Sequence, residues 1–484
     1  MDTAIVWFRQ DLRLADNPAL YHAAKSSRQL ILVYIHSPQE HGKWPPGAAS
    51  RWWLHHSLSD LQSRIKQLGG RLVVRQGDSQ QLLLQLIAQT GASAVYANYL
   101  YEPALAKRDD AIHTVLQNIG VSFHRYHGSL LLAPEALQTG SGTPFKVFTP
   151  YWKKHQQLYS PDKPLSAPKN LHNCETSVDS TSIAQLQLLP TINWYQGLEQ
   201  HWRPGEQHAL KTLKRFTQSA LDGYKERRDN PYERYTSALS PYLHFGEISP
   251  KQAYWHINHL ADPPAHNRYA SAETFIKELI WREFAYHILH HFPHTSDQPL
   301  DKRFQDFPYI KSNKKLLRAW QTGSTGYPLV DAGMRELWHC GWMHNRVRMI
   351  VASFLTKNCL MSWKQGAQWF WDTLVDADLA ANSFNWQWCA GCGADAAPYF
   401  RIFNPVTQSQ KFDPDGEYIK TWLPELRSLP DLYIHEPWKT PNNIQTETNV
   451  IIGKDYPLPV FDLKQSRQRA LDSYQQFVKT SAKK

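Results

Sequence analysis

Cysteine is scarce in this sequence, at five of the 484 residues. A small, odd number of cysteines excludes a disulfide-stabilised secreted scaffold and is typical of proteins in a reducing compartment. Cys389 and Cys392 form a C-x-x-C motif, but no second cysteine pair lies nearby to complete a zinc site. We therefore expect two small buried thiols at these positions and no metal.

Long hydrophobic runs are also absent. One of the longest, residues 349–355, is interrupted by Ser353 and is far too short to cross a bilayer. The N-terminus, Met-Asp-Thr-Ala-Ile, lacks the basic region and apolar stretch of a signal peptide. These absences exclude a membrane partner and predict a cytoplasmic protein.

Negative charge is in the minority. Lysine and arginine number 53 against 43 for aspartate and glutamate, a formal net charge of +10, and the isoelectric point is about 9.1. Basic surfaces attract polyanions, because phosphate contacts release condensed counterions. The charge favours a nucleic-acid partner, although a soluble protein that is merely basic has the same numbers.

The N-terminal part alternates short apolar runs with amphipathic stretches such as residues 50–68. The apolar runs are typical of buried strands and lie at residues 4–8, 30–35, 71–75, 94–97 and 121–124. This alternation predicts an α/β domain, a doubly wound parallel sheet with helices on both faces. Its ligand crevice should lie at the carboxyl ends of the strands, although the G-x-G-x-x-G fingerprint of dinucleotide-binding domains is missing.

The pattern changes twice further along the chain. Residues 136–204 are rich in Ser, Thr, Pro, Gln and Asn and predict a connector that is partly ordered at best. Helical spacing then dominates, as in residues 271–290 and 332–360. We expect four parts: an α/β domain over 1–135, the connector over 136–204, a mostly α-helical domain over 205–475 and a basic tip over 476–484.

Tryptophan is abundant, with 19 residues, many of them between Trp281 and Trp388. Such rings can fill a core, stack on nucleic-acid bases or pass electrons. Core filling is the default for any one ring, but the surrounding residues favour the other two roles.

Two short stretches each place polar, aromatic or sulfur-containing side chains on one face of an expected helix. Glu278, Trp281 and Arg282 have i, i+3, i+4 spacing and could accept from a base, stack on it and hold a phosphate. A surface salt bridge beside a core tryptophan has the same pattern. Asn345 and Met349, four apart, suit a base edge and a ring or methyl group, although a basic helix face with an incidental methionine is the simpler interpretation.

Charge and phosphate binding give further signals. Arg348 could pair with Asp376 or Asp378. Residues 236–240 carry three hydroxyls where a loop enters an expected helix, and hydroxyls and amides at a helix start bind phosphate. Simple capping is the commoner meaning of such residues in isolation.

Together these stretches resemble the photolyase/cryptochrome family, in particular the bacterial cyclobutane pyrimidine dimer (CPD) photolyases. The resemblance covers nearly the whole chain, and several long matches in the right order exclude chance. The matching motifs are Val-Trp-Phe-Arg-Gln-Asp-Leu-Arg-Leu-Ala-Asp-Asn-Pro at 6–18, Thr-Ser-Ala-Leu-Ser-Pro-Tyr-Leu at 236–243, Glu-Leu-Ile-Trp-Arg-Glu-Phe at 278–284, Thr-Gly-Tyr-Pro-Leu-Val-Asp at 325–331, Trp-Met-His-Asn-Arg at 342–346 and Asp-Ala-Ala-Pro-Tyr-Phe-Arg-Ile-Phe-Asn-Pro at 395–405.

The resemblance implies FAD, held in a bent shape in the helical domain. The positions that match its phosphate-side contacts are Tyr224, Thr236, Ser237, Ala238, Leu239 and Ser240. Asp376 and Asp378 match ribityl and ring contacts, with Arg348 paired to Asp376, and Asn382 matches the position facing the flavin N5. In the family, light excites the reduced flavin, which passes an electron to the dimer and regains it after the ring splits.

The resemblance also implies a pocket for a dimer flipped out of UV-damaged DNA. The matching positions are Glu278, Trp281, Asn345, Arg346, Met349 and Trp388. Glu278 would hydrogen-bond the dimer bases, while Trp281 and Trp388 would flank the rings. A damaged step is poorly stacked, so its extrusion costs less, and aromatic side chains replace the lost stacking.

Three tryptophans match the family's electron-transfer chain between flavin and surface: Trp386, Trp363 and Trp320. Core filling would be the simpler interpretation of any one of them alone. Trp369 and Trp371 could supply a branch.

Some stretches depart from the commonest bacterial form. Residues 368–372 and 389–395 are closer to the third class of CPD photolyases, the branch nearest plant cryptochromes. Residues 101–108 lack the Asn-Glu pair that holds a folate antenna in better-known enzymes. Methenyltetrahydrofolate in a different site is the first candidate for an antenna, a deazaflavin is the second, and an empty site is the third.

Two other activities occur in the family. A (6-4) photolyase usually needs a His-His pair where this chain has Met343, His344 and Asn345. A cryptochrome photoreceptor commonly has a long C-terminal extension, whereas this sequence stops soon after Lys464. A nucleic-acid-binding protein without flavin would leave the flavin-site matches unexplained. We therefore expect a deoxyribodipyrimidine photolyase that acts as a monomer.

Overall fold

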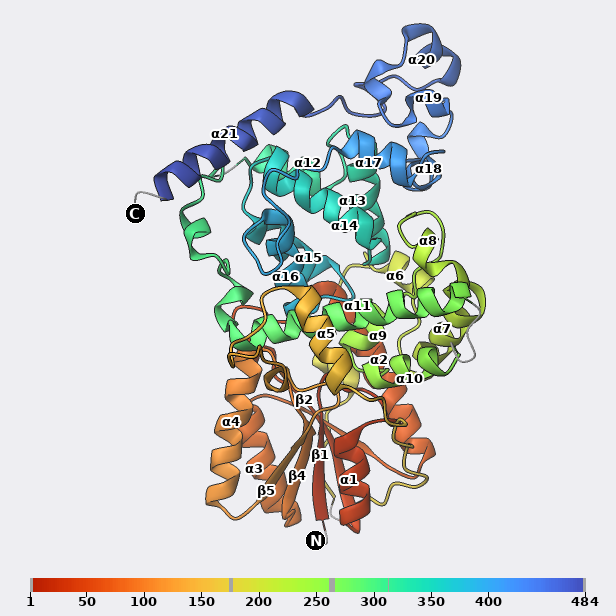
Figure 1. The fold of residues 1–484 in the computed structure, drawn as a ribbon. Coiled ribbons are helices and arrows are strands. Elements are labelled where there is room, and N and C mark those ends of the chain that lie inside the picture. The colour runs from red at the N-terminus through yellow and green to blue at the C-terminus, as the bar shows by residue number, and fades with distance from the viewer. Residues whose placement is uncertain (1–2, 174–176, 261–265, 312, 482–484) are drawn as a thin grey trace.

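The N-terminal part is a five-stranded sheet with every strand parallel, in the order β3-β2-β1-β4-β5 (Figure 1). The structure is a computed structural model and describes residues 3–173, 177–260, 266–311 and 313–481. The strands are β1 (Thr3–Phe8), β2 (Gln29–His36), β3 (Leu72–Gln76), β4 (Ala94–Asn98) and β5 (Ser122–Tyr126). The five expected strands and the α/β fold class are confirmed.

Helices cover both faces of the sheet: α1 (Pro18–Ser26), α2 (Ala48–Gln67), α3 (Ser79–Thr90) and α4 (Pro103–Asn118). Val6 of β1 packs in the core that includes α1 and α2, whereas the next residue, Trp7, packs in the core with α3 and α4. Successive side chains of a strand point to opposite faces, so a central strand buried on both sides must be apolar throughout.

The connector is more ordered than expected. It contains α5 (Phe148–Leu158), a 3₁₀ turn (Ile183–Leu186) and α6 (Gln196–His201). The amide of Leu30 donates to the carbonyl of His172 and the amide of Thr181 to that of Val74, both at 2.8 Å. The polar segment is ordered because its backbone groups pair with strands β2 and β3 of the sheet.

After the connector, the described chain forms helices joined by loops, with one short bridge between Ile452 and Tyr456. Its α-helices are α7 (Glu206–Ser219), α8 (Tyr224–Arg227), α9 (Ser240–His244), α10 (Pro250–Leu260), α11 (His266–His291), α12 (Lys314–Gln321), α13 (Pro328–Cys340), α14 (Asn345–Ser353), α15 (Trp363–Thr373), α16 (Leu379–Ala390), α17 (Pro405–Phe412), α18 (Glu417–Trp422), α19 (Asp431–Ile434), α20 (Asn442–Thr448) and α21 (Leu463–Ser481). Helix α11 crosses the middle of the molecule, with α12 to α16 on the side away from the sheet (Figure 1).

Helical spacing was expected to dominate residues 332–360, and the structure divides them into more than one helix. Gly341 ends α13 with a φ of 63°, and a Cβ there would lie 2.8 Å from Cγ1 of Val375. His344 then caps α14 by accepting from the amide of Arg346. Glycine in the left-handed region is a common helix end, and this one sets the angle between α13 and α14.

Arg13 joins the sheet domain to the helical domain. Its fully buried guanidinium donates to the carbonyls of Asp16 (2.7 Å), Gly128 (2.6 Å) and Gly246 (3.0 Å). Glu206, at the start of α7, accepts from two backbone amides of the same loop after β1. This short loop therefore ties together segments that are far apart in the sequence.

Replacing Arg13 by methionine should lower the free energy of unfolding by about 3–5 kcal/mol, because three buried carbonyls would lose their donor. Urea and thermal unfolding followed by circular dichroism would measure the loss. Arg71→Met, at an exposed position, is the control and should cost less than about 0.5 kcal/mol. Equal effects of the two substitutions would show that the domain junction does not depend on Arg13.

Candidate functional site

Asp376 lies in the loop that leads into α16 and receives three donors from two helices. The Arg348 guanidinium of α14 grips it with two hydrogen bonds of 3.1 and 2.9 Å. Arg348 is itself fixed by a 2.7 Å bond to the carbonyl of Met343. The Ser240 hydroxyl at the start of α9 donates to the same carboxylate at 2.6 Å. The structure therefore forms the Arg348–Asp376 pair that the sequence suggested, and it brings Ser240 to that pair.

Asp378 caps α16 by accepting from the amide of Ala381 at 2.9 Å. The Tyr286 hydroxyl of α11 donates to it, and Nδ1 of His244 in α9 lies 3.8 Å away. Burial alone would raise the pKa of Asp378, but the neighbouring His244 and Arg282 and the amide of Ala381 lower it to about 2. A buried, ionised carboxylate therefore faces the junction of three helices. The sequence did not single out His244, Arg282 or Tyr286 for this role.

Asn382 lies one helical turn after Asp378. Its side-chain amide donates to the carbonyl of Ala367 at 3.0 Å, which fixes the orientation of the amide group. The residue is buried, with 8% of its surface exposed. Asn382 thus lies on the same helix as the Asp378 cap, in a single orientation.

The predicted phosphate-side segment turns sharply into α9. Ala238 is in the left-handed region with a φ of 54°, and the amide of Leu239 approaches the hydroxyl oxygen of Ser237 at 3.4 Å. Thr236, Ser237 and Ala238 are half-buried, so their polar groups remain accessible. Tyr224 lies apart on α8, with the Arg228 guanidinium 5.2 Å from its ring centre.

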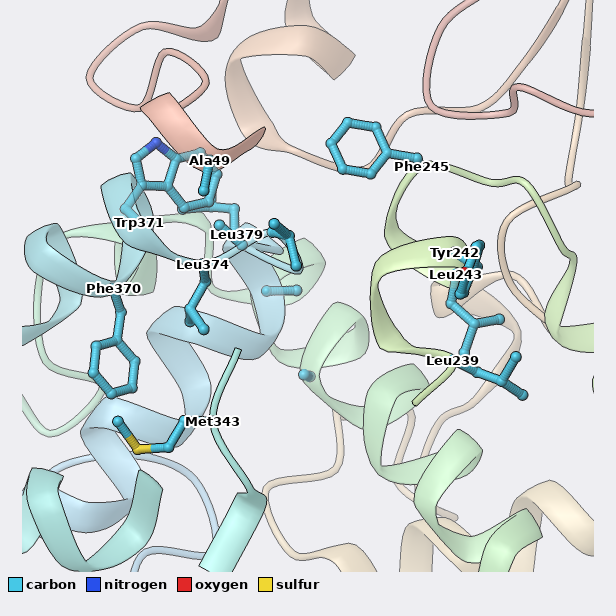
Figure 2. Close-up of a cluster of buried hydrophobic side chains, with 14 of the residues drawn as sticks. Ala49, Leu239, Tyr242, Leu243, Phe245, Met343, Phe370, Trp371, Leu374 and Leu379 are labelled. Carbon is cyan, nitrogen blue, oxygen red and sulfur yellow. The ribbon is translucent and has the colours of Figure 1, made fainter. Parts of the chain in front are cut away.

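Buried apolar side chains flank these polar residues in sequence (Figure 2). Leu239, Leu243 and Phe245 come from α9 and its flanks, and Phe370, Leu374 and Leu379 come from α15, α16 and the turn between them. Polar groups at Asp376 and Asp378 set in such surroundings are typical of a site that binds a large, partly aromatic cofactor.

Glu278 on α11 keeps part of its carboxylate open to solvent, with 35% of the side chain exposed. Arg228 donates to it from the loop after α8. The neighbouring residue, Asp229, accepts from Arg346 at 2.7 Å. Two adjacent loop residues thus orient two of the predicted substrate-pocket side chains, and the sequence analysis did not identify either of them.

Trp281 is stacked on Phe148, the first residue of α5, with ring centres 3.6 Å apart and planes inclined by 8°. The rings of Phe284 and Phe384 also contact the indole, with their planes inclined to it by 67° and 51°. One face of the indole is therefore covered by the connector. The polar composition of that segment concealed this contribution from the sequence analysis.

The remaining predicted pocket residues lie on two packed helices. Helix α16 packs against both α11 and α14, and it carries Trp388, whereas α14 carries Met349 and Asn345. Trp388 and Met349 are half-buried and Asn345 is exposed. Helix α16, with Trp388, therefore adjoins both helices that carry the other five predicted pocket residues.

The predicted electron-transfer chain needs a correction at its outer end. Trp386 meets Trp320 edge-on at 6.2 Å, but Trp320 is fully buried and donates to the carbonyl of Val351. Trp320 is thus a neighbour of Trp386 in the core and not a surface terminus. Trp363 is also buried, but it lines a cavity open to solvent together with Tyr309. Burial of this kind cannot be read from a motif.

The two other tryptophans of α15 have different surroundings. Trp369 is stacked on Trp338 at 5.9 Å and 8°, and 52% of Trp338 is exposed. Trp371 donates to the carbonyl of Pro45 and meets Trp44 edge-on. Trp369 therefore contacts a solvent-exposed indole, whereas Trp371 contacts the sheet domain.

A second cavity lies where the sheet domain meets the helical domain. It has about 720 Å³ of empty space, part of it open to solvent. The carboxyl ends of β1 and β2 supply Arg9, Gln10 and His36, and the helical domain supplies Phe245 and Trp371. This is the crevice that parallel sheets form at the ends of their strands.

Cys340, Cys359, Cys389 and Cys392 are free, buried thiols, and Cys174 lies outside the described residues. The pKa of the Cys389 thiol is raised to about 12 by burial, so this half of the C-x-x-C motif is chemically inert. Within the described residues no cluster of potential ligands could hold a metal ion. Among the helices of the described residues, none is long and apolar enough to span a bilayer.

Two family models match the chain. The model described as DNA photolyase covers residues 4–169, and the model described as FAD binding domain of DNA photolyase covers residues 275–476. The chain belongs to the DNA photolyase family. The resemblance noted in the sequence is thus confirmed, and the Asp376 and Asp378 site lies in the family's FAD-binding domain.

Similar photolyases and cryptochromes align along the whole chain. The deoxyribodipyrimidine photo-lyase of Agrobacterium fabrum is 46% identical over 479 residues, covering 99% of this chain and 98% of its own. Cryptochrome-2 of Arabidopsis thaliana is 38% identical, covering 96% and 77%. A solved bacterial class III photolyase from Agrobacterium tumefaciens has a TM-score of 0.95 at 44% identity, covering 99% and 98%. An archaeal photolyase from Sulfolobus tokodaii, solved with two FAD molecules, has a TM-score of 0.82 at 29% identity, covering 98% and 100%.

Gly366 lets Trp386 lie against α15, and its replacement should displace the indole. A Cβ at Gly366 would lie 2.0 Å from Cη2 of Trp386, so Gly366→Ala should cost about 1–3 kcal/mol of stability through overpacking. Near-ultraviolet circular dichroism and the unfolding midpoint would report the change. Gly140→Ala, where no atom lies within 4 Å of the added Cβ, should leave both unchanged. An unaltered tryptophan signal in Gly366→Ala would contradict this packing.

Proposed function

We propose that this chain is a deoxyribodipyrimidine photolyase, a lyase that uses blue light to repair cyclobutane pyrimidine dimers in DNA. The observation that carries the proposal is the arrangement on α11. Glu278 is a partly exposed carboxylate held by Arg228, and Trp281, one turn away, has one indole face covered by Phe148. The relatives named deoxyribodipyrimidine photo-lyase support the proposal.

The residues at the Asp376 site fit FAD. We assign the phosphate-side contacts to Tyr224, Thr236, Ser237, Ala238, Leu239 and Ser240. The half-buried hydroxyls and backbone of this segment suit an anion. Arg348 holds Asp376, and His244 with Arg282 keeps Asp378 ionised, so both carboxylates can accept from ribityl or ring donors. Asn382, with its amide fixed, is assigned to the flavin N5. FAD, when bound and reduced, supplies the electron that light drives into the dimer.

The substrate side is assigned to six residues: Glu278, Trp281, Asn345, Arg346, Met349 and Trp388. Glu278 accepts hydrogen bonds from the dimer bases, and Trp281 with Trp388 replaces the stacking lost when the dimer leaves the duplex. Arg346 and other basic groups at the rim bind phosphates without reading sequence. The partner is UV-damaged DNA, and we propose that one chain acts alone as a monomer.

We assign electron relay to Trp386, Trp363 and Trp320, with the outer end moved to Trp363 because this ring, although buried, lines a cavity that is open to solvent. The stacked pair of Trp369 and Trp338 is the proposed branch, since Trp338 is exposed to solvent. Parallel indoles in contact suit this role, because their π systems overlap.

An antenna chromophore is proposed for the cavity at the strand ends. Its apolar walls, including Leu54, Phe245 and Trp371, suit a flat heterocycle. The two arginines in its lining, Arg9 and Arg108, already pair with Asp109 and Glu40. Methenyltetrahydrofolate is the first candidate and a deazaflavin the second. We place the domain boundaries at residues 135 and 204. The antenna domain precedes the connector, and the catalytic domain follows it.

His344 argues against (6-4) photoproducts as the substrate. Its Nε2 donates to the carbonyl of Arg228 and its Nδ1 accepts from the amide of Arg346. Burial lowers the pKa of His344 to about 4. A neutral histidine with both nitrogens occupied cannot serve as an acid toward a lesion.

The proposal is tested by blue-light repair of a thymine-dimer oligonucleotide by purified, chemically reduced holoprotein. A (6-4) duplex and a dark sample are the controls. We expect light-dependent restoration of the thymine dimer alone. Flavin-loaded, reduced protein that repairs neither lesion would overturn the proposal in favour of a cryptochrome-type photoreceptor.

Glu278→Gln should lower the repair yield per absorbed photon about tenfold or more while FAD remains bound, because an amide cannot replace the carboxylate toward the dimer bases. Glu273→Gln is the matched control, since Glu273 lies on the same helix and only pairs with Lys277. Flavin absorbance and repair yield are measured on both. An unchanged yield in Glu278→Gln would remove Glu278 from the proposed role.

Phe148→Leu should raise the dissociation constant for dimer-containing DNA about 3- to 10-fold, because a ring–ring stack behind Trp281 is lost. Affinity for undamaged duplex should stay the same, and Phe148→Tyr should restore lesion binding. Fluorescence anisotropy with matched damaged and undamaged duplexes measures the difference. Equal losses on both duplexes would assign Phe148 to general folding.

A further inference from the structure

A basic hollow lies on the outer side of α9, away from the residues assigned above. We call it the α7 hollow, and it has about 600 Å³ of space open to solvent. Its lining residues are His201, Trp202, Arg203, His208, Lys211, Thr212, Arg215 and Tyr242. Three carry a permanent positive charge, two are histidines, and none is acidic.

The cations of the α7 hollow are not neutralised by the protein. In the part of the chain that the structure describes, neither Lys211 nor Arg215 pairs with a carboxylate, and Arg203 donates only to backbone carbonyls. Lys211 and Arg215 are four residues apart on α7, a spacing at which like charges repel. Two acidic residues act on this lining: the partly buried Asp60, beside His208, and the buried Glu247, which acts on Tyr242 and whose pKa burial raises to about 8. A concave surface with this charge attracts an anion.

The walls of the α7 hollow are rigid. Trp202 donates to the carbonyl of Cys340 at 2.7 Å, and the Tyr242 hydroxyl donates to the carbonyl of Arg203 at 3.0 Å. Arg203 is held in turn by its bond to the carbonyl of Trp202 at 2.7 Å. The cationic groups therefore surround a preformed floor, which lowers the entropic cost of binding a ligand.

Helix α9 separates the α7 hollow from the acidic pair of the flavin site. Ser240 and His244, four residues apart, share the helix face that meets Asp376 and Asp378. Tyr242 lies midway between them in sequence, so it points to the opposite side, where it lines the hollow. A ligand in the hollow would therefore press on the helix that positions Ser240 and His244.

We propose that the α7 hollow binds a small phosphate-bearing anion, of the kind carried by a nucleotide di- or triphosphate, and that its occupant braces α9 behind the flavin site. Several fixed cations within a compact concavity match the charge density of linked phosphates. Duplex DNA instead presents its phosphates along an extended path, so a small anion fits the hollow better. The binding site itself stands whether or not the repair activity does.

Inorganic pyrophosphate is the first probe, titrated calorimetrically into the FAD-loaded protein at low ionic strength. Lys211→Glu should weaken its binding about tenfold or more, since one cation becomes an anion. Lys214→Glu is the matched control: it makes the same charge change on the same helix, outside the hollow, and should weaken binding less than about twofold. Lys211→Arg should restore affinity. No binding by the unaltered protein, or equal losses in Lys211→Glu and Lys214→Glu, would overturn the site.

Two further titrations distinguish the source of the phosphate. Adenosine triphosphate that binds at least as well as pyrophosphate, with the same sensitivity to Lys211→Glu, supports a nucleotide-type ligand. An undamaged duplex that loses affinity in Lys211→Glu, while pyrophosphate binds neither protein, would assign the hollow to the DNA backbone and overturn the proposal.

The bracing of α9 has its own readout. Saturating pyrophosphate should slow the release of FAD, followed by flavin fluorescence after dilution, and Lys211→Glu should abolish the effect. Binding that leaves FAD release unchanged would overturn the link to the flavin site. This measurement does not depend on repair activity. A negative result for anion binding in the α7 hollow can therefore be told apart from a negative result for the proposed repair function.

Discussion

Asp378 must keep its negative charge in a place where burial alone would remove it. Its pKa lies at about 2 because the interactions with the neighbouring His244 and Arg282 outweigh burial. His244 belongs to α9 and Arg282 to α11, whereas Asp378 itself caps α16. The charge is therefore stable only when three helices from distant parts of the chain are assembled. Arg282 also donates to the carbonyl of Ser129, so the same network reaches the end of the sheet domain.

Other buried carboxyls in the molecule show what happens without this arrangement. Burial raises the pKa of Glu247 to about 8, because only neutral donors compensate, and that of Glu336 to about 7, although the charge of Arg348 acts on it. Burial likewise raises the pKa of Glu283 to about 7, although Arg282 and two backbone amides act against it. These groups can bind a proton near neutral pH and serve as hydrogen-bonding parts of the core. Asp378 differs from these three groups and lies at the α16 entrance, where a cofactor with its own donors is proposed to bind.

The sequence predicted what depends on local pattern. Strands buried on both faces must be apolar throughout, so β1 to β5 were recognisable. The Arg348–Asp376 pair followed from family motifs. Contacts between distant segments gave no such signal: Phe148 lies 133 residues before Trp281 in sequence but stacks on it, and its surroundings read as a polar linker. Trp320 was misplaced for a related reason, since a motif identifies a tryptophan but not its exposure. Tertiary packing determines both features.

Each proposed binding group is held from behind by a residue of another element. Arg228 from the loop after α8 holds Glu278, and Phe148 of α5 covers the rear of Trp281. Folding therefore restricts these side chains before any ligand arrives. The conformational entropy of the side chains is lost on folding, so it does not reduce the free energy of binding. A flipped-out lesion already requires unstacking energy, so a pocket that also had to order its own side chains would bind it weakly. The supporting residues, which carry no motif of their own, are consequently as important to recognition as the groups that touch the ligand.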